Sequence, residues 1–144
     1  RWNPIDVKKL IEHELECVIG VYPNKRYYWK DDKLTLNPSS VFETPFSGIN
    51  QLIKVKYGAT GFMLLARSAL ERVKDKVETF HLPGENGKQT TLYNFFDCKI
   101  VNNDYLTEDY HFSHLFNEAG GEIFADTSIQ LTHMGSHEYG SLIR

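Results

Sequence analysis

The sequence lacks several features by which large classes of protein are identified. No apolar run approaches the length of about 20 residues that crosses a bilayer as a helix, so no transmembrane segment is expected. There are only two cysteines, Cys17 and Cys98, and two cysteines do not make a disulfide framework. This cysteine usage fits a reducing compartment, and we predict a cytoplasmic location.

Neither sign of charge dominates. The chain has 16 basic and 19 acidic side chains in 144 residues, a net charge of −3, and no long run of either sign. A broad nucleic-acid-binding surface is therefore not expected. Four basic residues could either contact a phosphate group or simply make the surface soluble, and the sequence does not decide between these roles. They are Lys25, Arg26, Lys54 and Lys56. No repeat, low-complexity segment or linker divides the chain, so we predict one domain over residues 1–144.

The first third of the chain has the pattern of helix followed by buried strand. Asn3 and Pro4 are an N-cap and a proline at the first helical position, and the helix they open is predicted to end near Glu16. The continuous apolar run at 17–22 predicts a buried strand, which is typical of an α/β sheet. Residues 23–51 are polar and aromatic, and they predict a long loop or an irregular hairpin.

The rest of the chain continues in the same way. Alternation at 53–57 predicts a half-buried strand. Ser68 with Glu71 has the spacing of a capping box at the start of a second helix. Thr107 is placed to cap a third helix, which Gly120 would end in a left-handed conformation.

Two adjacent carboxylates, Glu108 and Asp109, fall in the first turn of this third helix. Acids there complement the helix dipole by well under ~1 kcal/mol each, and this structural explanation is the commoner one for such a pair. A functional explanation is that one of them acts as a general base, which must be ionised and held in place. Helical periodicity does not choose between the two acids.

The last predicted strand ends at a histidine. Ile129, Leu131 and His133 alternate with polar residues, so His133 is placed on the side that faces the core. Such a histidine is usually a hydrogen-bonded core residue, although one at a strand end can also reach a cleft and bind a metal. A structural zinc site built from His133 and His137 is not favoured, because nearby glycines argue against one helix that presents both.

An aromatic cluster, Tyr27-Tyr28-Trp29, lies in the predicted loop or hairpin. The sequence does not decide between two roles for these rings, which could stack on sugar faces or cover the edge of a sheet. Trp29 is the member that we regard as a candidate acceptor-binding residue.

Six segments in this order resemble a known family, and together they cover nearly the whole chain. They are Trp2-Asn3-Pro4, the run 18–23, the run 58–64, Phe95-Phe96-Asp97, the run 105–112 and the run 126–135. The chain resembles the C-terminal, acceptor-side half of glycosyltransferases of the GT-A type, particularly the small family-2-like enzymes of large DNA viruses and some bacteria. The last two segments are the most specific, because an acid pair is followed there by a helix, Gly-Gly, a strand and His-x-Gly.

The resemblance implies both a fold and an activity. The fold would be α/β, a mixed sheet flanked by helices, as in the C-terminal part of a Rossmann-like GT-A domain. The activity would be transfer of a sugar from a nucleoside diphosphate sugar to a hydroxyl of a glycan or protein acceptor, with inversion. Asp109 would be the catalytic base and Glu108 its neighbour and an acceptor contact. His133 would join the metal shell, and the turn Gly58-Ala59-Thr60-Gly61 would border the acceptor pocket.

The resemblance also implies a metal-binding motif and a nucleotide-binding half that the 144 residues do not contain. The family's Asp-x-Asp motif and its nucleotide-binding half lie upstream of the residues that match Arg1 to Pro4. Mn²⁺ or Mg²⁺ would take most of its oxygen ligands from there. We therefore expect the 144 residues to be a fragment that is inactive in isolation. The alternative is a non-catalytic carbohydrate-binding or assembly module on the same fold.

Overall fold

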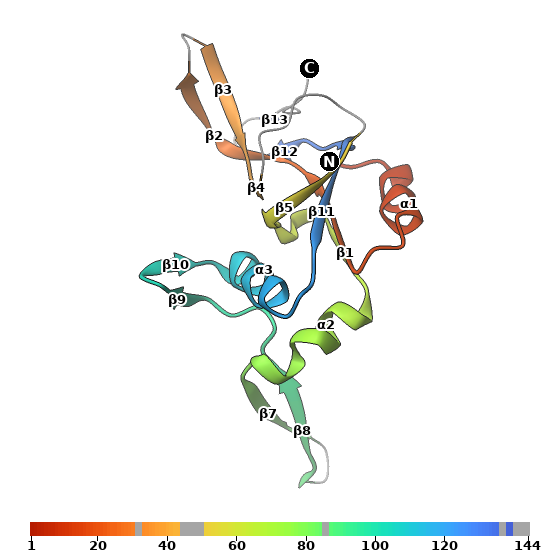
Figure 1. The fold of residues 1–144 in the computed structure, drawn as a ribbon, viewed down its shortest axis with the longest axis vertical. Helices are drawn as coiled ribbons and strands as arrows, with labels where there is room; N and C mark the ends of the chain where they lie inside the picture. Colours follow the sequence, from red (N-terminus) through yellow and green to blue (C-terminus); the bar gives the residue numbers. More distant parts are fainter. Residues whose placement is uncertain (31–32, 44–50, 85–86, 136–137, 140–144) are drawn as a thin grey trace.

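The structure is a computed structural model that describes residues 1–30, 33–43, 51–84, 87–135 and 138–139. Helices lie on either side of a central sheet, and hairpins project from it (Figure 1). The helical elements are α1 (Pro4–Glu12), η1 (Thr60–Phe62), α2 (Arg67–Val73), η2 (Lys74–Lys76) and α3 (Glu108–Glu118). The strands are β1 (Cys17–Val21), β2 (Pro23–Lys30), β3 (Lys33–Pro38), β4 (Val41–Phe42), β5 (Leu52–Tyr57), β6 (Met63–Leu65), β7 (Thr79–Pro83), β8 (Gln89–Tyr93), β9 (Lys99–Val101), β10 (Asp104–Leu106), β11 (Ile123–Gln130), β12 (His133–Met134) and β13 (Glu138–Tyr139).

The central sheet has five strands in the order β4-β5-β11-β1-β6. The pair β1 and β11 is parallel, whereas β5, β4 and β6 join the sheet antiparallel. A parallel pair needs a long crossover, and here α2 and α3 lie in the chain between the two strands. The mixed sheet with its helices confirms the predicted α/β class.

The core has two parts because alternate residues of β1 point to opposite faces of the sheet. Cys17, Ile19 and Val21 pack with α2 and α3, while Val18 packs on the other face with Leu10 of α1. All five residues of β1 are buried, as expected for a strand covered on both faces. The continuous apolar run at 17–22 therefore correctly predicted a buried strand, which ends at Val21.

The start of α1 and the end of α3 follow the predicted capping residues. The Asn3 side chain accepts from the N–H of Ile5 at 3.1 Å, and Asp6 accepts from the N–H of Asn3 at 2.8 Å. Helix α1 then ends at Glu12, about one turn earlier than predicted. Helix α3 is followed by Gly120 with a φ of +78°, which is the left-handed conformation that ends a helix.

Two further sequence predictions of local structure were wrong. Helix α2 begins at Arg67, after Ala66, without a side-chain cap; Glu71 pairs with Arg67 at 2.8 Å, and Ser68 lowers the pKa of Glu16 instead of capping the helix. The last long strand, β11, begins at Ile123 and ends at Gln130, well before the predicted end at residue 133. The predicted loop or hairpin at 23–51 contains the β2–β3 hairpin and the short edge strand β4, and residues 44–50 lie outside the described ranges.

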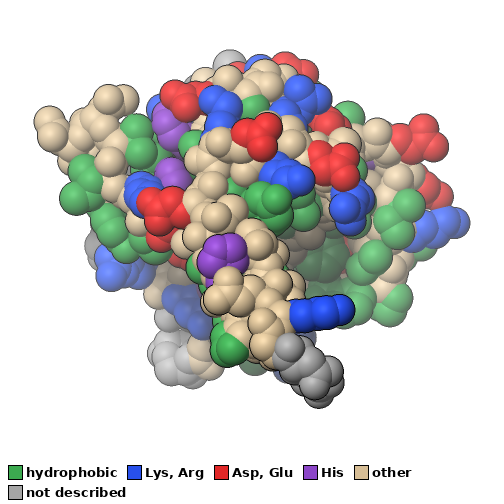
Figure 2. Space-filling model, turned by 90° about the horizontal axis from the view of Figure 1, so that it is seen from below, with side chains coloured by type: hydrophobic (Ala, Val, Ile, Leu, Met, Phe, Trp, Pro, Cys, Tyr) green, Lys and Arg blue, Asp and Glu red, His purple; other side chains and the backbone are tan. Residues whose placement is uncertain are grey.

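Two hairpins, β7–β8 and β9–β10, project from the α2 and α3 side (Figure 1). Viewed from the end where β7 and β8 project, acidic and basic side chains are interspersed with hydrophobic ones (Figure 2). This face therefore carries no extended basic surface. Among the helices within the described ranges, none is long and apolar enough to cross a membrane.

Candidate functional site

Asp109 and Glu108 occupy the first turn of α3, as predicted. One oxygen of Asp109, Oδ1, accepts from the Thr107 hydroxyl at 2.6 Å and from the N–H of Tyr110 at 2.9 Å. Within the described part of the chain, no residue bonds to Oδ2. The carboxylate is thus fixed in direction by two donors and keeps one oxygen for another molecule.

Glu108 is more exposed than Asp109. Its Oε2 lies 4.0 Å from the thiol of Cys98, which precedes β9. The two acids therefore differ in their surroundings: Asp109 is half-buried and held by its own helix, whereas Glu108 faces solvent beside a hairpin. This difference favours Asp109 as the acid with a fixed geometry, a choice that periodicity alone could not make.

Tyr22, directly after β1, is close enough to both acids to feel their charge, and it contacts His133. Burial raises the pKa of its hydroxyl, and the negative charges of Asp109 and Glu108 raise it further, although the N–H of Gly61 and the Ser39 side chain act in the opposite direction. Its ring meets the His133 ring edge-on, with 5.1 Å between centroids and an interplanar angle of 81°. Apart from its place at a strand end, no pattern in the sequence pointed to this residue.

His133 is half-buried in β12. Its Nδ1 lies 2.9 Å from the carbonyl oxygen of Pro23, which can only accept, so in the neutral ring Nδ1 is the nitrogen that carries the proton and Nε2 has the lone pair. The histidine is fixed in this tautomer by a residue 110 positions away in sequence. The contact between His133 and Tyr22 shows that the end of β1 lies next to β12.

The predicted acceptor turn is held by its own backbone N–H groups. Gly58 and Ala59 are buried, and their N–H groups donate to Ser113 Oγ and Ser40 Oγ, both at 3.1 Å. Thr60 and Gly61 are exposed. Of the four predicted acceptor contacts in this turn, these two are thus the residues that another molecule can reach.

Gly61 has a specific steric role. Its N–H donates to the Tyr22 hydroxyl at 3.1 Å, and a Cβ at this position would lie 2.4 Å from that oxygen. Only glycine therefore allows the phenol to approach the turn so closely. This contact connects Gly61 with His133 through Tyr22.

A pocket of about 270 Å³ lies beside this contact. Tyr22, Gly61 and His133 form part of its wall, and Trp2 and Phe62 form an aromatic side, with ring centroids 6.0 Å apart. The remaining lining residues are Arg1, Leu131, Thr132 and Met134. The structure thus brings His133 and Gly61 into one pocket, whereas Asp109 and Glu108 do not line it. The side chain of Trp29 lies outside the described part of β2.

A chain of hydrogen bonds joins the first turn of α3 to the pocket. The Tyr110 hydroxyl donates to the carbonyl oxygen of Ser39 at 2.9 Å. Ser39 in turn donates its N–H and its hydroxyl to the carbonyl oxygen of Tyr22, at 3.0 and 2.9 Å. Tyr110 also stacks on Tyr57 of β5, with centroids 4.9 Å apart. These contacts fix Tyr22 relative to the helix that carries Asp109.

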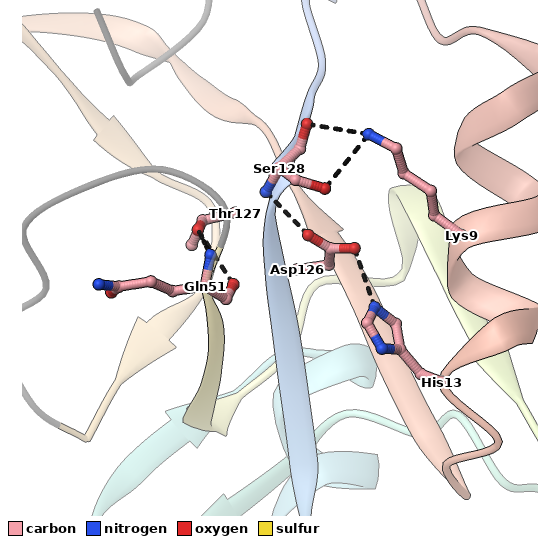
Figure 3. Close-up of polar contacts among 6 residues, drawn as sticks. All are labelled: Lys9, His13, Gln51, Asp126, Thr127 and Ser128. Atoms are coloured by element: carbon pink, nitrogen blue, oxygen red, sulfur yellow. Dashed lines mark hydrogen bonds and ion pairs between the residues drawn. The ribbon is translucent and has the colours of Figure 1, made fainter.

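A second polar cluster, which the sequence analysis missed, lies on the α1 side of β11 (Figure 3). Asp126 is buried and accepts from His13 Nε2 at 2.9 Å and from the N–H of Ser128 at 2.8 Å. Burial by itself raises the pKa of Asp126, but the hydrogen bonds from His13 and Ser128 outweigh it and hold the pKa below its usual value. The polar run at 126–128 within an apolar strand was the available signal.

This second cluster attaches α1 to the sheet. Lys9 of α1 donates to the Ser128 hydroxyl at 3.2 Å, while His13 bonds to Asp126 (Figure 3). A nucleophilic serine needs a base within hydrogen-bonding reach, and here the partner of Ser128 is a lysine that donates. On the opposite side of the strand, Thr127 bonds to the backbone of Gln51. We interpret the cluster as structural.

The described residues contain no group of three or more His, Cys, Asp or Glu side chains that could hold a metal ion. His133 offers one nitrogen, whereas Mn²⁺ and Mg²⁺ prefer a set of oxygen ligands. The residues described here therefore do not make up such a site by themselves. Comparisons with known protein families, with curated protein sequences and with solved structures found no match.

Proposed function

We propose that this chain is the acceptor-side part of a GT-A glycosyltransferase, which transfers a sugar from a nucleoside diphosphate sugar to a hydroxyl acceptor. The observation that carries the proposal is the geometry of Asp109. Its carboxylate is held by two donors at the start of α3, and Oδ2 has no bond to any described residue. An acid with one fixed and one available oxygen is suited to take a proton from an alcohol.

The reaction would be a single displacement. Asp109 would accept the proton of the acceptor hydroxyl as its oxygen attacks the anomeric carbon. The bond from that carbon to the diphosphate oxygen would break, the diphosphate would leave with the bonding electrons, and the configuration would invert. Glu108, exposed beside Asp109, would contact the acceptor.

His133 would be one nitrogen ligand of a divalent metal. The bond from Nδ1 to the Pro23 carbonyl supports this assignment, because metal-binding histidines commonly donate their other ring N–H to a carbonyl or carboxylate. The oxygen ligands would come from the Asp-x-Asp motif of the family. A bound metal would compensate the charge of the diphosphate.

A second function is favoured by the pocket. Trp2, Phe62 and Tyr22 present aromatic surface beside a histidine and a hydroxyl, which is a suitable lining for a sugar ring. A non-catalytic carbohydrate-binding or assembly module would use the same pocket without transferring anything.

One assay separates the two functions. The natural protein is incubated with Mn²⁺, UDP- or GDP-sugars and saccharide acceptors, and both nucleoside diphosphate release and the glycosylated product are measured. A glycosyltransferase forms nucleoside diphosphate and glycosylated product in equal amounts, and chelation of the metal stops the formation of both. A binding module binds saccharides in a calorimetric titration and gives neither product.

A further inference from the structure

The hydroxyl of Tyr22 lies in the wall of the pocket and has two hydrogen-bonding neighbours, Gly61 and Ser39. The group accepts one bond, from the N–H of Gly61 at 3.1 Å. A phenol hydroxyl can also donate one bond, and the Ser39 side chain is the neighbour that interacts with it in addition. Because Tyr22 lines the pocket with Gly61 and His133, a molecule in the pocket can accept that hydrogen in place of Ser39.

Contacts on three sides hold this hydroxyl in place. The backbone oxygen of Tyr22 accepts two bonds from Ser39, and its ring rests edge-on against His133. The absence of a side chain at Gly61 allows the phenol oxygen to reach the backbone of the turn. A donor held in this way loses little conformational entropy when it binds a ligand, so it contributes to specificity.

The size and lining of the pocket point to one chemical class of ligand. Its volume of about 270 Å³ is just below the range of roughly 300–1,000 Å³ that holds drug-sized ligands, so it suits a single ring. Trp2 and Phe62 supply an apolar side, and Tyr22 supplies a fixed donor. A pyranose ring has the matching features, because its C–H face packs on aromatic rings and its hydroxyls accept hydrogen bonds.

We infer that Tyr22 is a further acceptor-binding residue, whose hydroxyl donates a hydrogen bond to one hydroxyl oxygen of a pyranoside in this pocket. The inference rests on the proposed function, since it names the class of acceptor at that site. It also makes Tyr22 a specificity-determining residue: it favours acceptors that carry an oxygen at one ring position over the corresponding deoxy sugars.

The test is a binding experiment on the 144-residue chain. Methyl glucoside, methyl galactoside and methyl mannoside are titrated into the wild-type chain, Tyr22→Phe and Tyr93→Phe, and the affinities are measured by NMR. Tyr22→Phe keeps the ring that packs on His133 and removes only the hydroxyl. Tyr93→Phe is the matched control, because it removes a hydroxyl from β8, far from the pocket in the sheet topology.

The best-bound pyranoside should bind Tyr22→Phe about three- to tenfold more weakly than the wild type, the loss expected for one hydrogen bond. Tyr93→Phe should bind it like the wild type. In addition, one monodeoxy analogue should lose a similar factor with the wild type and bind Tyr22→Phe as well as its parent sugar does.

Three outcomes would overturn the inference. They are equal affinity of the wild type and Tyr22→Phe, the lack of any deoxy analogue that loses affinity for the wild type, and no binding of any of the three pyranosides. None of these outcomes decides the transfer reaction, which is judged by nucleoside diphosphate release in the natural protein. A failure of the inference is therefore distinguishable from a failure of the proposed function.

Discussion

The Ser113 hydroxyl donates to the carbonyl oxygen of Asp109 at 2.8 Å, one turn earlier in α3. The Ser113 hydroxyl oxygen also accepts from the N–H of Gly58 at 3.1 Å. One buried side chain therefore joins the helix that carries the proposed base to the turn that leads to the pocket.

Replacing Ser113 by alanine should destabilise the protein by about 1–3 kcal/mol, because the buried N–H of Gly58 would lose its partner. Urea unfolding followed by circular dichroism measures this difference. Thr60→Ala, an exposed change in the same turn, is the control and should lie within about 0.5 kcal/mol of the wild type. A Ser113→Ala variant as stable as this control would contradict the proposed connection.

Gly61→Ala should displace the Tyr22 ring, because the new Cβ would lie 2.4 Å from the phenol oxygen. Overpacking of this kind typically lowers the free energy of unfolding by about 1–3 kcal/mol, which urea unfolding followed by circular dichroism would again measure. The cost should largely disappear in a Tyr22→Ala background, where the clashing ring is absent. If Gly61→Ala costs the same in both backgrounds, the Tyr22 contact is not its cause.

The stability of the protein should decrease with acid, partly through Asp126. Its pKa in the folded state is below the usual 3.8, so below about pH 4 the unfolded chain binds more protons than the folded one. The ionised group thus contributes stability that is complete above the unfolded-state pKa and is lost as the pH falls through the folded-state pKa.

Asp126→Asn should therefore be less stable near neutral pH, by roughly 2 kcal/mol, and should show a smaller loss of stability below pH 4. Unfolding free energies measured between about pH 3 and pH 7 test both statements. Glu118→Gln, an exposed change at the end of α3, is the control and should keep the pH dependence of the wild type. Parallel curves for the wild type and Asp126→Asn would contradict the assignment.

Phe112 should be one of the side chains most important for the stability of α3. It is fully buried, and its ring stacks on Phe96 and Phe116 with centroids 4.9 and 5.9 Å away. Phe112→Ala should cost about 3–5 kcal/mol, the usual range for such a cavity. Phe96→Ala, which removes a partly exposed ring from the same stack, should cost less than half as much. Thermal or urea unfolding ranks the two variants, and equal costs would show that burial does not set the difference.

Elements defined by local patterns were predictable from the sequence. The strand β1 follows from an uninterrupted apolar run, and the start of α1 follows from Asn3 and Pro4. The start of β11 was missed because Asp126 and Thr127 interrupt its apolar pattern. These polar residues are buried only because His13 and Gln51, distant in sequence, supply their partners.

The candidate site was predictable only in part, for the same reason. An acid pair in a first helical turn and a histidine near a strand end are local signals, and both residues lie in elements of those kinds. The role of Tyr22 depends on contacts with Gly61 and His133, which are 39 and 111 positions away. No local pattern encodes such contacts.

The central claim is that Asp109 removes the proton from the acceptor hydroxyl. Its most direct test is the turnover number of the natural protein and of its Asp109→Asn variant, with Glu118→Gln as the control on the same helix. The amide keeps an oxygen for the Thr107 hydroxyl and the N–H of Tyr110, but it cannot act as the base. We expect turnover to fall about 10²- to 10⁴-fold in Asp109→Asn and to stay unchanged in Glu118→Gln. Equal turnover in all three proteins would contradict the account.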